Sequence, residues 1–177
     1  MSPANPPFDW RAISSGIGAV LGGILLGKFF SSLELEVFAH AAARLVGLLS
    51  GAPVVRDAGG WTVSLAGSPI VVTAACSATD YFLIVAGLIG FQAARRRINL
   101  LAAAGMGLAA ALPVTIFVNA VRIVTVAYAH PWLISRLPAT YDAFLHMCAG
   151  AAVFLPSLIG LNLLLETHGN LRRPAPL

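Results

Sequence analysis

The stretch VVTAACSATDYFLIVAGLIGFQAARRR, residues 71–97, combines the three kinds of sequence that decide the fold. It opens with a short β-branched run, continues through Cys76 into an apolar segment, and ends on three consecutive arginines. An apolar segment that stops at basic residues is typical of a membrane-spanning helix. Cys76 lies where the β-rich run meets this helix, so it is either a small apolar side chain filling a packing gap or a nucleophile at the edge of the bilayer.

The composition of the whole chain also indicates an integral membrane protein. Of the 177 residues, 58% are hydrophobic and 10% are charged, and the mean hydropathy is +0.85. A soluble domain of this size does not need so apolar a composition for its core. Small residues such as Gly105, Gly107 and Gly150 are spread through the apolar runs, which suits helices that pack closely in lipid.

Four apolar segments are predicted to cross the membrane as helices, each close to the ~20 residues that a bilayer requires. They comprise approximately residues 12–30, 76–94, 100–127 and 143–165. The first has no small-x-small cleavage site after its apolar run, so we expect an uncleaved anchor. The sequence shows no second soluble domain, and residues 1–177 are therefore predicted to form a single, all-α membrane-embedded domain.

The basic residues predict the orientation of this domain in the membrane. Arginines cluster at Arg95–Arg97 and Arg172–Arg173, and by the positive-inside rule these clusters and Arg11 are cytoplasmic. Four crossings then leave both termini in the cytoplasm and place Cys76 on the extracytoplasmic face of the cell's inner (plasma) membrane. Because the basic residues form local clusters rather than a broad face, we attribute them to topology in the lipid bilayer and expect no nucleic-acid binding.

The segment between the first two spans is predicted to lie outside the lipid core. Residues 35–50 suit an amphipathic helix in the outer interface, and a fifth span is the competing interpretation. Its apolar positions recur at helical spacing: Phe38, Ala42, Leu45, Leu48 and Leu49. Residues 54–74 contain short β-rich runs separated by turn residues, which predicts a small hairpin or ribbon that ends just before Cys76.

The residues after Cys76 have the form of a helix start. Ser77, Ala78, Thr79 and Asp80 match the S-x-x-D capping box, which predicts Ser77 as the N-cap of the second spanning helix. A thiol at this place feels the positive end of the helix dipole, which favours the thiolate, although Asp80 opposes this effect. Considered alone, a cysteine in an apolar helix is more often an inert structural residue.

Arg122 is the second unusual residue, because it lies among apolar side chains near the outer end of the third span. Thr115, Asn119 and Arg122 are spaced at i, i+4 and i+7, so they form one polar stripe that we expect to face the bundle interior. The alternative is an arginine that reaches the lipid headgroups. Asn119 argues against this alternative, because such an arginine needs no amide one turn deeper.

His146 is the third, just inside the outer end of the fourth span, with Gly150 four residues later on the same helical face. A lone histidine in an apolar helix is more often structural than catalytic. In the predicted topology, however, Cys76, Arg122 and His146 come from three different helices and all lie at the extracytoplasmic end. This convergence predicts a functional site.

The three motifs resemble those of the exosortase/archaeosortase family. They are A-C-S at Ala75–Ser77, N-x-x-R at Asn119–Arg122 and H-x-x-x-G at His146–Gly150, in this order. The likeness covers roughly residues 35–165, and the small size suggests a minimal member, of the K type. One departure is that the family usually has glycine after Cys-Ser, where this chain has Ala78.

The resemblance implies a cysteine protease-transpeptidase embedded in the membrane. Such enzymes cleave a C-terminal sorting signal of exported, membrane-anchored proteins, which often contains Pro-Glu-Pro followed by an anchor helix and a basic tail, and transfer the protein to an acceptor through a thioester. Carried over to this chain, Cys76 is the nucleophile, Arg122 the transition-state stabiliser and His146 the acid/base, with Asn119 and Ser77 in support. The resemblance implies no metal and no cofactor.

Three alternatives remain open on the sequence. A metal site could use Cys76, His146, Cys148 or His130, but Cys148 follows His146 by two residues, so the two point about 200° apart on a helix. A disulfide between Cys76 and Cys148 would remove the nucleophile. A structural membrane subunit or small transporter would use the polar stripe for packing or permeation, without thiol chemistry.

Overall fold

The computed structural model describes residues 9–29, 37–65, 67–73, 76–134, 136 and 139–170. Within this part the fold is mainly helical, with one small antiparallel sheet immediately before Cys76, as predicted. In chain order the elements are α1 (Trp10–Phe29), α2 (His40–Ser50), β1 (Val54–Asp57), β2 (Gly60–Leu65), β3 (Ser68–Val72), α3 (Thr79–Arg95), α4 (Leu100–Ile134), a short 3-10 helix η3 (Ala139–Tyr141) and α5 (Asp142–Asn170).

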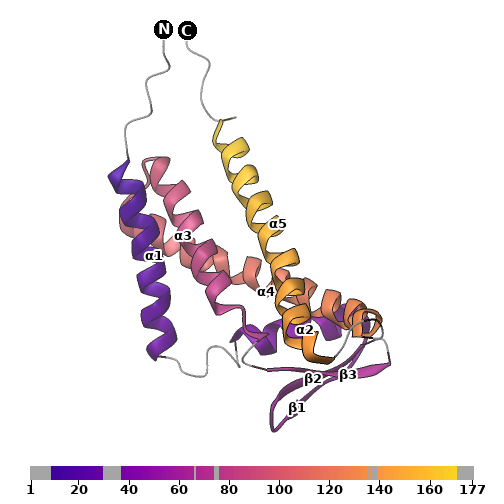
Figure 1. Ribbon diagram of the computed structural model, residues 1–177. Helices are drawn as coiled ribbons and strands as arrows, with labels where there is room; N and C mark the ends of the chain where they lie inside the picture. Colours follow the sequence, from indigo (N-terminus) through magenta and orange to yellow (C-terminus); the bar gives the residue numbers. More distant parts are fainter. Residues whose placement is uncertain are drawn as a thin grey trace.

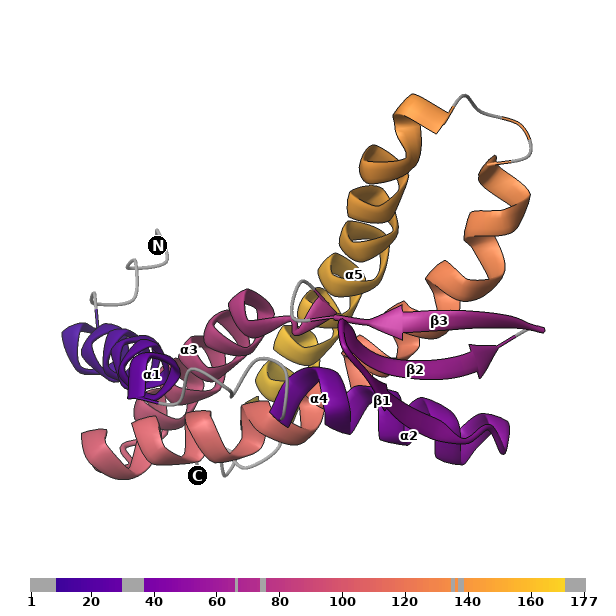
Figure 2. The same cartoon turned by 90° about the horizontal axis from the view of Figure 1, so that it is seen from below.

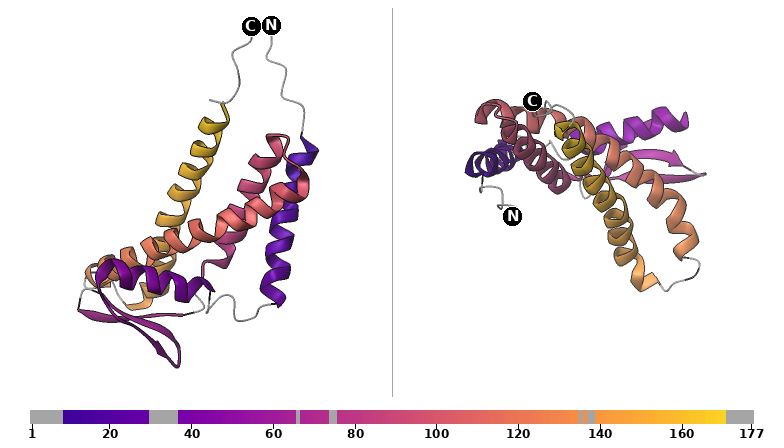
Figure 3. Two further views of the ribbon diagram at one scale, coloured as in Figure 1. Left: turned by 180° about the vertical axis from the view of Figure 1, so that it is seen from behind. Right: turned by 90° about the horizontal axis from the view of Figure 1, so that it is seen from above.

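The sheet and the two ends of the described chain lie at opposite ends of the helices. The start of α1 and the end of α5 lie at one end of the molecule, and the sheet lies at the other, next to the start of α3 (Figure 1). Helix α4 crosses obliquely between these two ends, as seen from behind in Figure 3. Cys76 is therefore at the sheet end, and Arg95–Arg97, at the C-terminal end of α3, are at the opposite end.

Two of the described helices are both long and apolar enough to cross a bilayer. These are α4, apolar over Leu100–Ala129, and α5, apolar over Phe144–Thr167. The apolar part of α1 is shorter, Trp10–Leu25, and α3 has 17 residues, which correspond to about 26 Å of helix. The length and composition of α4 and α5 support a membrane location, whereas the predicted crossings by α1 and α3 stay predictions.

Helices α1, α3 and α4 pack through small residues. A Cβ atom added to Gly107 on α4 would lie 2.5 Å from the backbone oxygen of Ala86 and 3.1 Å from the backbone nitrogen of Gly90, both on α3. On α1, the hydroxyl of Ser15 donates to the backbone oxygen of Gly90 at 3.2 Å. Close approach through small residues is thus confirmed at Gly107, whereas Gly105 has open space around its Cα and makes no such contact.

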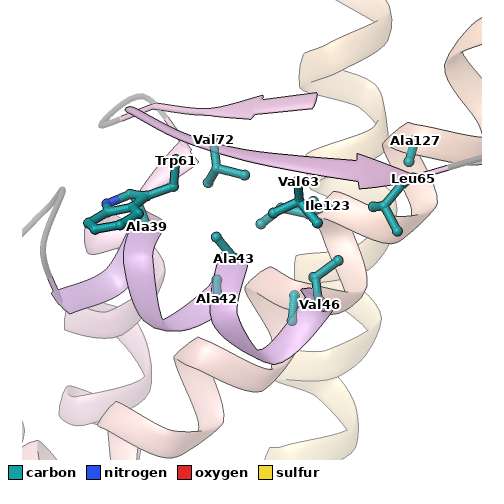
Figure 4. Packing of buried hydrophobic residues seen from close by; sticks show 11 residues of the cluster. Ala39, Ala42, Ala43, Val46, Trp61, Val63, Leu65, Val72, Ile123 and Ala127 are labelled. Carbon is teal, nitrogen blue, oxygen red and sulfur yellow. The ribbon is translucent and has the colours of Figure 1, made fainter. Parts of the chain in front are cut away.

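The sheet and α2 form a second packing unit, which rests on the C-terminal half of α4. The strands pair in the order β1-β2-β3, so the predicted ribbon has three strands. One face of the sheet packs on α2 and α4 through a buried cluster that includes Ala42, Val46, Val63, Val72 and Ile123 (Figure 4). The ring of His40 also stacks on that of Trp61, with centroids 3.7 Å apart.

Helix α2 turns small residues toward the protein. Its buried positions are Ala42, Ala43, Val46 and Gly47, whereas Leu48 and Leu49, two apolar positions of the predicted amphipathic helix, are 82% and 72% exposed. Packing against the sheet selects small residues because the backbones lie close together. Helix α2 has 11 residues, or about 16 Å, which is less than the ~20 residues of a bilayer span, and the choice between an interfacial helix and a fifth span stays a prediction.

The Gly107 contact gives a test of the packing. We expect Gly107→Ala to lower stability by about 1–3 kcal/mol, because the added methyl group meets backbone that cannot rotate away. Gly105→Ala in the same helix should leave stability unchanged or raise it by up to ~1 kcal/mol, since alanine favours the helix. Thermal unfolding of the two variants in detergent measures the difference, and equal melting temperatures would contradict the observed helix packing.

Candidate active site

Cys76 lies in the tight connection between β3 and α3. Its backbone N–H donates to the backbone oxygen of Thr73 at 2.9 Å, and the Thr73 hydroxyl lies 4.0 Å from the Cys76 sulfur. The side chain is half-buried and its thiol is free. Cys148, on α5, is also free and is exposed, so the structure does not form the disulfide considered above. The turn therefore presents an unblocked thiol.

The predicted capping box after Cys76 is wrong. Helix α3 begins at Thr79, and its N-cap residue is Ala78, with no hydrogen bond from a side chain. The hydroxyl of Ser77 instead pairs with that of Thr79 at 2.9 Å. The physical reason is the backbone of Ala78, which turns into the left-handed region at φ 57° and ψ 31° and so carries Ser77 away from the first turn of the helix. Ser77 is buried and supports the turn rather than the helix end.

The left-handed conformation also shows what the departure from glycine at position 78 costs. An L-residue in this region suffers contacts between Cβ and its own backbone that glycine avoids. Ala78 therefore stores backbone strain two residues from the thiol, at a place where glycine would fit without it.

The polar stripe on α4 faces the interior, as predicted. Thr115 and Asn119 are fully buried and Arg122 is 9% exposed, so Arg122 is not extended to the surface as a headgroup anchor would be. The Asn119 side-chain amide donates from Nδ2 to the backbone oxygen of Cys76 at 2.5 Å. This hydrogen bond joins α4 directly to the cysteine turn.

Arg122 is enclosed by α5. The guanidinium carbon lies 5.4 Å from the centre of the Phe154 ring, and a Cβ atom added to Gly150 would lie 3.2 Å from Arg122 Nε. The guanidinium therefore occupies space that any larger residue at position 150 would fill. Within the described part of the chain, Nε is buried without a hydrogen-bond partner. A buried donor without a partner is costly, and it is available to an acceptor on a ligand.

Phe154 is in turn fixed by α3. Its ring stacks on Tyr81 with centroids 4.6 Å apart, and the Tyr81 hydroxyl pairs with Ser157 at 2.7 Å. The order Tyr81, Phe154, Arg122 thus runs from α3 through α5 to α4. Neither Phe154 nor Tyr81 was predicted from the sequence, although Phe154 continues the four-residue spacing that starts at His146 and Gly150.

His146 is half-buried on α5, one turn before Gly150. Residues four apart share a helical face, so His146 lies on the side of α5 that meets Arg122, whereas Cys148 is exposed. Direct contacts thus connect Cys76 with Asn119, and Arg122 with Gly150. His146 is placed on the same face of α5 as Gly150 by its four-residue spacing. The arrangement offers a thiol, an imidazole and a buried guanidinium donor.

The strain at Ala78 is testable by substitution. Ala78→Gly should relieve about 1–2 kcal/mol of left-handed strain and lose less than ~1 kcal/mol through the greater freedom of the unfolded chain. We expect a small rise in melting temperature. Ala110→Gly, at an exposed interior position of α4, should instead lower stability by about 1 kcal/mol. A fall of similar size in both variants would show that Ala78 is not strained.

Comparison with known proteins identifies the family. The sequence profile of the family described as transmembrane exosortase matches residues 10–163, from the start of α1 to near the end of α5. Searches among curated proteins and among solved structures find no match. The matched region includes Cys76, Arg122 and His146 and covers most of the chain. The protein therefore belongs to the transmembrane exosortase family.

Proposed function

We propose that this protein is a cysteine peptidase-transpeptidase that cleaves the C-terminal sorting signal of exported, membrane-anchored proteins. Membership of the exosortase family supports a membrane sorting enzyme. The observation that carries the catalytic assignment is the buried Arg122, held against Gly150 and Phe154 with Nε unpartnered, on the helix whose Asn119 holds the cysteine turn.

The proposed reaction begins at Cys76. Its thiolate attacks the scissile carbonyl, and the tetrahedral intermediate collapses as the C–N bond breaks. His146 protonates the leaving amine, and the substrate remains as a thioester on Cys76. A second nucleophile from an acceptor, or water, then attacks the thioester and releases the thiol.

Arg122 is proposed to stabilise the oxyanion formed in the first step. Its donors are fixed before the substrate arrives, because the Phe154 ring and the Gly150 backbone leave the guanidinium little freedom. Fixed donors in a site of low dielectric stabilise developing charge more than water does. Asn119 is a positioning residue, because its hydrogen bond to the Cys76 carbonyl sets where the thiol lies relative to α4.

The proposed topology places this chemistry on the extracytoplasmic face of the inner membrane. Exposed Arg95–Arg97 lie at the end of the molecule opposite the sheet and Cys76, together with the start of α1 and the end of α5 (Figure 1). If the arginines are cytoplasmic, both termini are cytoplasmic and the thiol faces outward. Two further crossings, by α1 and α3, belong to this proposal.

The nucleophile is tested by co-expression with a reporter that carries Pro-Glu-Pro, an anchor helix and a basic tail at its C-terminus. We expect Cys76→Ala and Cys76→Ser to abolish processing, because neither supplies a thiolate. Cys148→Ala should process normally, since Cys148 is exposed on α5. Immunoblots of the shortened reporter give the result. A structural subunit or transporter predicts no dependence on either thiol, and inactivation by Cys148→Ala alone would refute the assignment.

The role of Arg122 is tested by Arg122→Lys. Lysine keeps the charge but lacks the planar fork of donors, so turnover should fall by on the order of a hundredfold or more, as for the loss of an oxyanion donor. Processing is measured per unit of membrane-inserted protein. If Arg122 only anchors the helix, the lysine variant should process almost as well as the wild type.

Gly150→Ala is the complementary test from the other helix. Its methyl group would displace Arg122 Nε, so we expect processing to fall while the protein still inserts. Gly160→Ala on the same helix is the matched control, because nothing lies within 4 Å of the added Cβ. Equal activity of the two variants would show that the Gly150 contact does not set the position of the guanidinium.

A further inference from the structure

Strand β3 leads directly into the cysteine turn and is an edge strand. Among the described residues it pairs only with β2, whereas β2 lies between both neighbours. Only three residues separate its last residue, Val72, from Cys76. Figure 2 shows the arrowhead of β3 directed toward the start of α3, and β2 runs along only one side of the strand.

The pairing register shows which backbone groups of β3 face this open edge. Two residues separate the paired Leu65 and Ser68, and a two-residue hairpin closes on a hydrogen-bonded pair. Hydrogen-bonded and non-bonded pairs alternate in an antiparallel ladder. Pro69, opposite Ser64, is therefore in a non-bonded pair, which agrees with its lack of an N–H group. Val71, opposite Thr62, is in the next non-bonded pair.

Val71 consequently directs both its N–H and its C=O away from β2. Its side chain is 45% exposed, on the sheet face opposite the buried cluster. An outward donor and acceptor on one residue match one residue of a second extended chain, and strand addition at such edges is a common mode of peptide binding. Pro69 offers no N–H at the distal part of the strand, which confines pairing to the part nearest Cys76.

We propose that the open edge of β3 binds the substrate polypeptide in an extended conformation, as a fourth strand paired with Val71. The inference rests on the proposed function and specifies how the substrate backbone is aligned with the Cys76 thiol. An extended chain advances about 3.3 Å per residue, so pairing at Val71 carries the substrate along the cysteine turn and places a carbonyl a few residues further on at the Cys76 sulfur. Main-chain pairing fixes the register of the scissile bond while the thiol and Arg122 act on it.

A photo-crosslinking amino acid at position 71 tests binding without turnover. The full-length protein carries Cys76→Ser and is co-expressed with the Pro-Glu-Pro reporter. Position 55 on β1 is the matched control, because Val55, Thr62 and Val71 lie in one row across the sheet and Val55 is 58% exposed on the opposite edge. We expect a crosslink to the reporter from position 71, at least ~10-fold above position 55. No reporter crosslink, equal crosslinks, or a crosslink mainly to a second copy of this chain would overturn the proposal.

A pair of variants tests the backbone contact itself. Val71→Pro removes the outward N–H without breaking a hydrogen bond to β2, whereas Val71→Ala shortens the side chain and keeps the N–H. We expect Val71→Pro to lower kcat/KM at least ~10-fold relative to Val71→Ala, at equal amounts of inserted protein. Equal activity would refute strand pairing and leave the proposed function standing, provided that Cys76→Ala is inactive. Processing by Cys76→Ala would instead refute the proposed function. The crosslinks would still show whether the reporter binds at the open edge of β3.

Discussion

The burial of one guanidinium among three apolar helices constrains the rest of the site. Arg122 is buried among apolar side chains, where a charge is energetically costly and usually indicates a function, and its neighbours leave Nε without a hydrogen-bond partner in the described part of the chain. Gly150 supplies space and Phe154 supplies a ring face. Because these residues lie on α5 and Tyr81 supports Phe154 from α3, the three helices must meet at this depth. The requirement of one side chain thus fixes the relative positions of three helices.

The sheet is connected to this site through the backbone rather than through side chains. Asn119 binds the carbonyl of Cys76, and the left-handed Ala78 ends the turn that β3 enters. A displacement of the sheet would therefore move the cysteine turn, while α4 resists that displacement through both Asn119 and the cluster around Ile123. Local backbone strain at such a place is characteristic of functional sites held by their surroundings.

The sequence predicted those features that depend on hydropathy and spacing. The helical segments follow from hydropathy, the β-rich segment before Cys76 from its composition and turn residues, and the buried stripe of Thr115, Asn119 and Arg122 from helical spacing. The capping box failed because Ser77 can cap a helix only if the next residue stays in an ordinary conformation, and Ala78 does not. Helical spacing alone did not show which side of α2 meets the sheet: Leu48 and Leu49 are exposed, because an apolar residue in a membrane protein can equally face lipid.

The position of His146 depends on how α5 is held, and this helix buries little of its apolar surface. Large apolar side chains such as Leu155, Ile159 and Leu163 are exposed, and in lipid such groups gain little from helix association. Polar contacts with α3 align the helix instead. Their partners on α5 follow in sequence: Tyr81 pairs with Ser157, Gln92 donates to Asn162, and Arg96 donates to the backbone oxygen of Leu165.

These contacts fix the register of α5 along α3 over the C-terminal half of α5. A slip of one residue would break all three hydrogen bonds and would also replace Gly150 with an alanine against Arg122, since both neighbours of Gly150 in the sequence are alanines. The register that satisfies the polar contacts is therefore the one that admits the guanidinium, and it holds His146 one turn away. The hydrogen bonds near the C-terminal end of α5 and the glycine at position 150 near its N-terminal end thus favour the same register of α5.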